Sequence, residues 1–226
     1  MLVKDWMTKL PINLQEDATV VDAAEIMFKN NIRQLPVTDA NGKLVGIISD
    51  RDVRDALPSK YLPGDTLLEE GGLFNLKVKD IMSIDPIVTY PEETVENVAH
   101  TLQTYKIGGL PVVDANNNLI GIITEVDVFK YLCRVTGIMM PGIQLIFHLP
   151  DTPGATIDLL TTLRGKKVRL TSVLTSYENI EQGYRKVSIH IQDAGGSSLE
   201  ELVEALKQNY DLRYYVKDGK AVKVKD

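Results

Sequence analysis

Two short stretches of this chain end an apolar run with a hydroxyl residue and place a carboxylate three residues later. GIISDRD puts Ser49 before Asp52, and GIITEVD puts Thr124 before Asp127. A hydroxyl residue at a helix start with an acidic residue three positions on is the layout of a capping box. The same groups could instead bind a nucleotide, because helix N-termini suit phosphates and a carboxylate accepts hydrogen bonds from a vicinal diol.

The acidic residue itself favours the second possibility. Asp is shorter than the Glu or Gln that is usual at this position of a capping box. We therefore expect it to reach the amide at the helix start less well and to stay available to a ligand. Two copies in one register strengthen this expectation, because duplication keeps the geometry of a site.

The two stretches belong to an internal repeat. Residues 3–57 align with residues 78–132 at a constant offset of 75 and without a gap. VKDWM pairs with VKDIM, LPVTDAN pairs with LPVVDAN, and the two hydroxyl–carboxylate stretches pair with each other. One supersecondary unit has therefore been duplicated.

Each repeat is predicted to form a helix, a hairpin and a second helix. Thr19 is expected to cap a helix whose apolar residues recur with the spacing of one helical face, and Thr94 does the same in the second repeat. The β-branched runs 35–38 and 44–48 flank turn residues and predict a hairpin. The hydroxyl residue of each stretch then lies where a strand ends and a helix begins.

The repeats differ around the hydroxyl–carboxylate stretch, where only the first carries arginines. These are Arg33, Arg51 and Arg54, and the matching residues of the second repeat are Gly108, Val126 and Phe129. Guanidinium groups bind phosphates through charge-assisted hydrogen bonds, so a phosphate would prefer the first repeat. The alternative is that the arginines are surface charges that answer nearby acidic residues.

The chain is expected to have four parts. Residues 1–57 and 78–135 hold the repeats, and residues 58–77, which mix Pro, Gly and acidic residues, are expected to form a linker or lid. The helix-breaking sequence MMPG then precedes a further domain over residues 140–226. That domain has strand and helix patterns in the order β-α-β-β-α-β, with a capping-box pattern at Ser197 and Glu200. This order is the split-βαβ or ferredoxin-like arrangement, so the fold class is α/β (α+β).

The duplicated unit resembles a pair of cystathionine β-synthase (CBS) domains over nearly all of residues 1–135. In that family the aspartate of the stretch holds the ribose hydroxyls of an adenosine ligand, and the Ser or Thr holds its phosphate. The resemblance therefore implies an adenine nucleotide as regulatory ligand. By position, the residues it implicates are Ser49, Asp52, Thr124 and Asp127, with Pro11-Ile12 and Pro86-Ile87 as the strands that frame the base.

The C-terminal domain is similar to ACT domains, which are small regulatory modules that often bind amino acids at the loop after the first strand. Here that loop contains Asp151, Pro153 and Gly154, and it either binds a small metabolite or only begins a helix. The order of two CBS units and an ACT-like domain resembles the acetoin utilisation AcuB-like family. The sequence SVLTSYENIEQGYRKVSIHI looks like the middle of the ACT region of that family.

Composition and motifs disfavour several functions. The net charge is −6 and the densest basic run, Arg164 to Arg169, is short, so no nucleic-acid partner is expected. No signal-peptide or membrane-spanning run occurs and Cys133 is the single cysteine, so we expect a cytoplasmic protein without a membrane partner. The three histidines fall in different elements, and neither a nucleophile motif nor a P-loop is found, so neither a metal site nor catalysis is expected.

Together these observations predict a non-catalytic sensor. It would bind an adenosine-containing nucleotide through the CBS pair, need no other cofactor, form a homodimer, and report to a partner protein. The alternative is an assembly scaffold in which the CBS pair has no physiological nucleotide.

Overall fold

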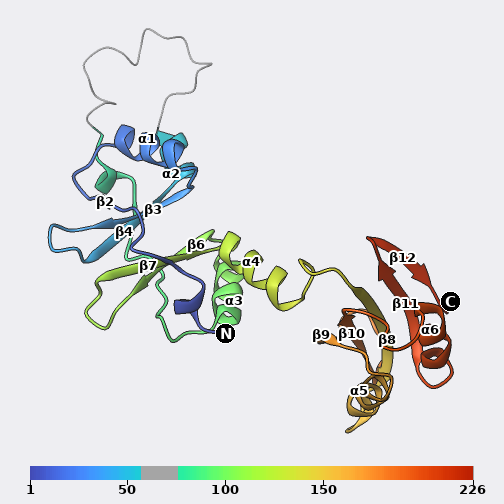
Figure 1. Cartoon of the computed structure of the whole chain (residues 1–226). Coiled ribbons are helices and arrows are strands. Elements are labelled where there is room, and N and C mark those ends of the chain that lie inside the picture. The colour runs from blue at the N-terminus through green and yellow to red at the C-terminus, as the bar shows by residue number, and fades with distance from the viewer. Residues whose placement is uncertain (57–75, 226) are drawn as a thin grey trace. The chain divides into compact units, whose positions relative to one another are not determined.

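The computed structural model describes residues 1–56 and 76–225 of the 226-residue chain (Figure 1). These residues form two compact units, Met1–Tyr131 and Leu132–Asp226. The linker or lid expected over residues 58–77 lies outside the described residues, except for its last two. None of the helices in the described ranges is long and apolar enough to cross a membrane.

The first unit contains both repeats, and each has the predicted order of helix, hairpin and helix. In the first repeat the elements are α1 (Val20–Asn30), β3 (Gln34–Thr38), β4 (Leu44–Ser49) and α2 (Asp50–Ala56). In the second they are α3 (Val95–Tyr105), β6 (Gly109–Val113), β7 (Leu119–Thr124) and α4 (Glu125–Val135). The strands are held in register by antiparallel pairing within each hairpin.

Short segments at the start of each repeat add to the sheet of the other repeat. β1 (Thr8–Lys9) pairs with β7, and β5 (Ser83–Ile84) pairs with β4. With β2 (Leu14–Gln15), the two sheets have the orders β1-β7-β6 and β2-β3-β4-β5. The repeats are therefore interlocked, which the sequence does not reveal because two-residue strands are too short to show a hydrophobic period.

The helix starts in this unit are capped as predicted. Thr19 Oγ1 accepts a hydrogen bond from the Asp22 amide at 3.1 Å, and the Asp22 carboxylate accepts one from the Thr19 amide at 2.9 Å. Thr94 Oγ1 accepts from the Asn97 amide at 3.2 Å. The Asp22 contact shows that an aspartate is long enough to complete a capping box in this fold.

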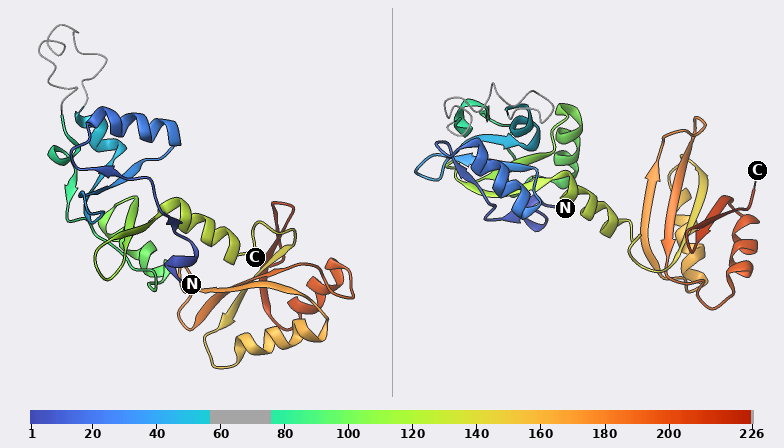
Figure 2. Two further views of the ribbon diagram at one scale, coloured as in Figure 1. Left: turned by 60° about the vertical axis from the view of Figure 1, so that its left-hand side comes forward. Right: turned by 90° about the horizontal axis from the view of Figure 1, so that it is seen from above.

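The second unit is one antiparallel sheet with two helices. Its elements are β8 (Ile143–Pro150), α5 (Ala155–Gly165), β9 (Leu170–Ser176), β10 (Tyr184–Ile191), α6 (Leu199–Lys207), β11 (Asp211–Lys217) and β12 (Lys220–Lys223). They follow the predicted order with β12 added, and the strand order is β12-β11-β8-β10-β9. Leu145, Phe147 and Leu149 of β8 are buried with apolar residues of α5 and α6, so both helices lie on one face of the sheet (Figure 2).

The capping box of α6 begins one residue later than predicted. Ser198, not Ser197, is the N-cap, and its Oγ accepts from the Glu201 amide at 3.1 Å. The Ser197 hydroxyl instead donates to the Ala194 carbonyl at 3.1 Å. The position of the N-cap was ambiguous in the sequence, because two adjacent serines are each followed by a glutamate three residues later.

Candidate functional site

Both hydroxyl–carboxylate stretches lie at a junction between a strand and a helix. Ser49 is the last residue of β4, and Asp52 lies in the first turn of α2. Thr124 is the last residue of β7, and Asp127 lies in the first turn of α4. Each pair is therefore placed at the end of its hairpin, as the sequence indicated.

The carboxylates are bonded to the hydroxyl residues that precede them. Asp52 Oδ2 accepts hydrogen bonds from the Ser49 amide and the Ser49 hydroxyl, both at 2.7 Å. Asp127 Oδ2 accepts from the Thr124 amide at 3.0 Å and the Thr124 hydroxyl at 2.7 Å. The expectation that Asp reaches back less well is wrong. The backbone turns tightly enough at each junction for the shorter side chain to complete the cap.

The cap uses one oxygen of each carboxylate, and the second oxygen differs between the repeats. Asp127 is 6% exposed, and its Oδ1 lies 3.2 Å from Lys130 Nζ. Asp52 is partly exposed, and no side chain of the described residues bonds to its Oδ1. Capping and ligand binding are therefore compatible at Asp52, because they use different oxygens.

The glycine that opens each stretch allows the other repeat to pack closely. A Cβ atom on Gly46 would lie 2.4 Å from the sulfur of Met82, and one on Gly121 would lie 2.6 Å from the sulfur of Met7. Met82 and Met7 directly precede the exchanged strands β5 and β1. These glycines therefore fix the position of β4 and β7 by letting the exchanged segments approach the strands.

The three arginines of the first repeat do not have equivalent surroundings. The Arg33 carbonyl accepts from the Asp50 amide at 2.9 Å, and the side chains of Arg33 and Arg51 are exposed. Arg54 is bound to Asp50, with Nη2 at 3.2 Å from the carboxylate and Nε at 3.1 Å from the carbonyl. Pairing with a neighbouring acidic residue, the alternative considered for these arginines, therefore applies to Arg54.

The Pro-apolar segments Pro11-Ile12 and Pro86-Ile87 lie outside the named strands, so their prediction as strands is wrong. The first is tied down by Asn13, whose Nδ2 donates to the Pro11 carbonyl at 3.3 Å. Ile12 is 44% exposed and Ile87 is 39% exposed. The proline ring removes one backbone donor from each segment, which disfavours strand pairing there.

Strand register places the first of these segments at the same end of the sheet as Ser49. β2 runs parallel to β3 with Leu14 opposite Val37, so the chain before β2 lies toward the start of β3. At that start Gln34 pairs with Ser49. The exposed isoleucine of the segment thus lies at the end of the sheet where the hydroxyl–carboxylate pair is found.

Gln34 at the start of β3 was not predicted as a site residue, and its side chain lies against the second repeat. A Cβ on Gly109 would lie 2.4 Å from Gln34 Oε1, and one on Gly108 would lie 2.6 Å from Nε2. Gln34 Oε1 is buried and has no hydrogen-bond partner among the described residues. The sequence contained a signal for this contact. Arg33-Gln34 of the first repeat aligns with Gly108-Gly109 of the second, although the residues around them are similar in the two repeats.

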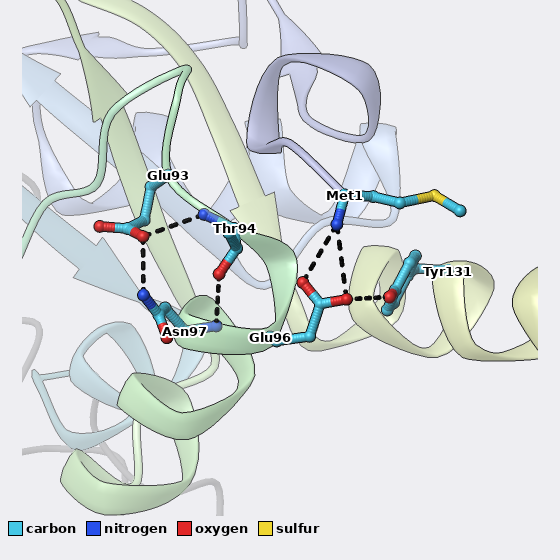
Figure 3. A network of polar contacts seen from close by, with 6 residues as sticks. All are labelled: Met1, Glu93, Thr94, Glu96, Asn97 and Tyr131. Atoms are coloured by element: carbon cyan, nitrogen blue, oxygen red, sulfur yellow. Dashed lines mark hydrogen bonds and ion pairs between the residues drawn. The ribbon is translucent and has the colours of Figure 1, made fainter. Parts of the chain in front are cut away.

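The helix that carries Asp127 is fixed by a polar network around Glu96 (Figure 3). The Tyr131 hydroxyl donates to the Glu96 carboxylate, which also accepts from the Met1 amine at 3.2 and 3.4 Å. The bond to Glu96 and the burial of the ring raise the pKa of Tyr131 to about 12, and the same bond lowers the pKa of Glu96. Tyr131 therefore remains a hydrogen-bond donor at neutral pH and holds α4 against α3.

The loop after β8 contains the residues expected either to bind a metabolite or to begin a helix. Gly154 has a φ of 93°, in the left-handed region that favours glycine, and directly precedes α5. The Asp151 carboxylate accepts from the Tyr177 hydroxyl at 3.3 Å and lies 3.6 Å from Arg185 Nε. Pro153 is exposed beside them. Asp151 thus connects this loop to the β10 side of the sheet.

No group of three or more His, Cys, Asp or Glu side chains within residues 1–56 and 76–225 is arranged to hold a metal ion.

Comparison with known proteins defines the class of the chain. The CBS domain profile matches residues 3–59 and 78–134, which is half of the sequence. The chain therefore belongs to the CBS domain family, as the repeat had suggested. Its fold is mixed α/β with a tandem CBS pair.

Two curated relatives differ in how much of their length matches this chain. The CBS domain-containing protein DDB_G0289609 from Dictyostelium discoideum is 36% identical over 60% of this chain and 93% of that protein. An L-aspartate semialdehyde sulfurtransferase from Methanocaldococcus jannaschii is 35% identical over 57% of this chain. The match spans only 23% of that sulfurtransferase.

Several solved structures are similar to the chain, among them the following three. The CBS domain pair of protein MJ0100, solved with 5′-methylthioadenosine and S-adenosyl-L-methionine, is 33% identical with a TM-score of 0.50, covering 58% of this chain and 95% of the other. CBSX2, solved with AMP, is 31% identical with a TM-score of 0.50, covering 59% and 97%. A Vibrio cholerae protein described as an acetoin utilization protein (AcuB) is 32% identical with a TM-score of 0.51, covering 62% and 95%.

Proposed function

We propose that this chain is a regulatory protein whose CBS pair binds an adenosine-containing ligand. The observation that carries the proposal is the Ser49–Asp52 pair, in which Oδ2 of the carboxylate caps α2 and Oδ1 is not used by the cap. The pair is repeated as Thr124–Asp127. The AMP complex of CBSX2 and the 5′-methylthioadenosine and S-adenosyl-L-methionine complex of MJ0100 support the ligand class.

The residues of the first repeat have distinct proposed roles. Asp52 Oδ1 accepts hydrogen bonds from the ribose hydroxyls, and the exposed side chain of Ile12 contacts the base. Arg33 and Arg51 bind a 5′-phosphate through charge-assisted hydrogen bonds, with Ser49 beside them. In the second repeat the matching residues are Thr124, Asp127 and Pro86-Ile87, but Lys130 contacts Asp127 Oδ1 and no arginine stands at the matching positions, so that site is the weaker of the two.

We further propose that residues 140–226 are an ACT-like domain coupled to the CBS pair of residues 1–57 and 78–135. The strand order β11-β8-β10-β9 supports this, because it is the order expected of a ferredoxin-like βαββαβ unit. The chain would act as a homodimer that reports to a partner protein. Light scattering would then return about twice the 25.1 kDa mass of one chain.

Thermal-shift measurements on the full chain test the nucleotide proposal. AMP, ADP, ATP, 5′-methylthioadenosine and S-adenosyl-L-methionine are compared with GMP as a control for the base. A ligand that binds only the native state stabilises it by RT ln(1 + [L]/Kd), so at least one adenosine compound should raise the melting temperature while GMP does not.

The matched variant is Asp52→Asn, which keeps an oxygen for the cap and loses the charge. Its ligand-induced shift should be reduced while its melting temperature without ligand stays close to that of the wild type. Failure of every adenosine compound to stabilise the wild type would favour the assembly scaffold. The observed capping boxes fit that alternative, because they give the stretch a structural role without any ligand.

A further inference from the structure

Basic side chains surround a cavity in the second unit, and Asp151, Pro153 and Gly154 are not among its lining residues. The cavity has a volume of about 280 Å³. Its basic lining residues are His148, Lys186, Arg213, Lys223 and Lys225, and Tyr214 and Asn179 complete the wall. No sequence motif marks this group, because its basic members are scattered over 78 residues of the chain.

The sheet brings these residues together on the face opposite its two helices. Successive residues of a strand point to opposite faces, so His148 points away from the core that contains Phe147. Lys186 of β10 is the partner of His148 in the register, and Lys223 of β12 is the partner of Tyr214 in β11. Neighbouring strands therefore present these side chains side by side.

A strand irregularity adds Arg213 to the same wall. The register of β11 against β8 shifts between Leu212 and Tyr214, which leaves Arg213 as the extra residue. Such bulges re-aim side chains. The Arg213 carbonyl accepts hydrogen bonds from the Val224 and Lys225 amides at 2.9 and 3.3 Å, so the segment after β12 is held over the cavity.

The charges around the cavity are unbalanced. Its permanent cations include Lys186, Arg213 and Lys225. The carboxylate of Asp211 lies 3.7 Å from Arg213 Nη1 and 3.3 Å from Lys225 Nζ. One carboxylate does not neutralise these three cations, and a concave surface with one sign of charge concentrates counter-ions. This excess is local, because the chain as a whole has a net charge of −6.

His148 responds to the same surroundings. Burial lowers the pKa of His148, and the charge of Arg213 lowers it further. Lys186 acts in the same direction and Asp211 opposes them. A neutral imidazole offers one N–H donor to a ligand without adding a charge that would need neutralising.

We propose that this cavity binds a small molecule with two or more negative charges, such as a phosphorylated metabolite or a polycarboxylate. Lys186 and Arg213 supply charge-assisted hydrogen bonds, and Tyr214 and Asn179 supply neutral ones. The volume lies at the lower end of ligand pockets, which favours a compact anion over a nucleotide. The proposal does not depend on nucleotide binding by the CBS pair.

Calorimetric titration of the full chain with pyrophosphate and with citrate tests the proposal at constant ionic strength, with acetate as the singly charged control. The wild type should bind at least one of the two anions saturably. The double variant Lys186→Gln/Arg213→Gln should lower that affinity at least about tenfold. The matched control is Lys217→Gln/Lys220→Gln, which removes two lysines from the β11–β12 turn and should leave the affinity unchanged.

The outcomes separate the possibilities. Preference for pyrophosphate assigns the ligand to phosphorylated compounds, and preference for citrate assigns it to polycarboxylates. Absence of saturable binding by the wild type up to about 10 mM of either anion overturns the proposal. An equal loss of affinity in both double variants also overturns the proposal, because such a loss would depend only on the overall charge of the protein.

Displacement of pyrophosphate by a tighter-binding single-stranded oligonucleotide would assign the surface to nucleic acid instead. If the first double variant unfolds, the NMR ring resonances of His148 in the wild type test the proposal instead. They should shift on addition of pyrophosphate, and the absence of a shift would overturn the proposal.

Discussion

Ser49 and Asp52 exchange three hydrogen bonds across the junction of β4 and α2, two to one carboxylate oxygen and one from the Asp52 amide back to the hydroxyl. The side chain proposed to hold a ribose is therefore also a helix cap. Stability and ligand binding are coupled through one residue, because its removal affects both.

The first prediction concerns stability without ligand. Asp52→Ala and Asp127→Ala should each lower the free energy of unfolding of the first unit by about 0.5–2 kcal/mol, the usual cost of losing a cap. Asp127→Ala should cost more, because its side chain is more buried and also contacts Lys130. Chemical denaturation of both variants measures this. Unchanged stability would mean that the caps are not formed in solution.

The second prediction concerns ligand affinity. Asp52→Asn should weaken AMP binding by at least about tenfold, the equivalent of one charge-assisted hydrogen bond. Asp127→Asn should have the smaller effect, because Lys130 occupies the second oxygen and no arginine of the described residues lies beside that stretch in the sequence. Titration of both variants with AMP checks this order. A larger loss for Asp127→Asn would place the stronger site in the second repeat.

The third prediction concerns the network that fixes α4. The Tyr131 bond lowers the pKa of Glu96 below its ordinary value of 4.5, so this contribution to stability is present above pH 4.5 and is lost as the pH falls through the folded pKa. Tyr131→Phe should therefore be less stable than the wild type at pH 7, by about 1 kcal/mol, and the difference should shrink toward acidic pH.

Tyr105→Phe is the control for that comparison, because Tyr105 is 60% exposed on α3. It should match the wild type at every pH. A difference between Tyr131→Phe and the wild type that stays constant from pH 7 to below 4.5 would mean that Glu96 does not contribute through its charge.

The parts of the fold that follow from local periodicity could be predicted from the sequence. The helix beginning at Val20 and the hairpin ending at Ser49 have enough residues to show their hydrophobic patterns. The exchange of β1 and β5 could not be predicted, because each strand pairs with a segment of the other repeat and not with its neighbour in sequence. The duplication nevertheless contained the clue, since Thr8 pairs with Ile122 as Ser83 pairs with Ile47.

The candidate site was predictable in its residue types and less so in its contacts. Whether Asp52 reaches the Ser49 amide depends on the local backbone, which the spacing of residues does not determine. The basic cavity was not predictable either. His148 and Lys186 are neighbours only because of strand register, and Arg213 joins them through an irregularity that leaves no sequence pattern.

The fourth prediction concerns the contact between Gln34 and Gly109. A Cβ on Gly109 would lie 2.4 Å from Gln34 Oε1, at the end of a flexible side chain, and 3.1 Å from Thr124 Cγ2, so Gly109→Ala should destabilise the first unit by about 1 kcal/mol. In a Gln34→Ala background the same change should cost less, because the nearest atom is gone. Gly165→Ala, where a Cβ meets nothing within 4 Å, is the control. Additive costs in the double variant would show that Gln34 does not lie against Gly109.

The last prediction concerns His148. Its pKa is lowered from the ordinary value of 6.5 by burial and then by Arg213, so an NMR titration should place its midpoint below 6.5. In the window between that midpoint and 6.5 the unfolded chain binds more protons than the folded chain. The stability of the second unit should therefore rise with pH across this window and be lost as the pH falls through the folded pKa.

Arg213→Gln should raise that midpoint, because a neighbouring positive charge disfavours the imidazolium. Asp211→Asn should lower it, since the carboxylate is the group that favours the charged ring. Pyrophosphate added to the wild type should raise the midpoint for the same electrostatic reason, and Lys217→Gln should leave it unchanged. A midpoint that Arg213→Gln leaves in place would show that the guanidinium does not face His148 in solution, and a midpoint insensitive to pyrophosphate would remove the ring from the proposed anion site.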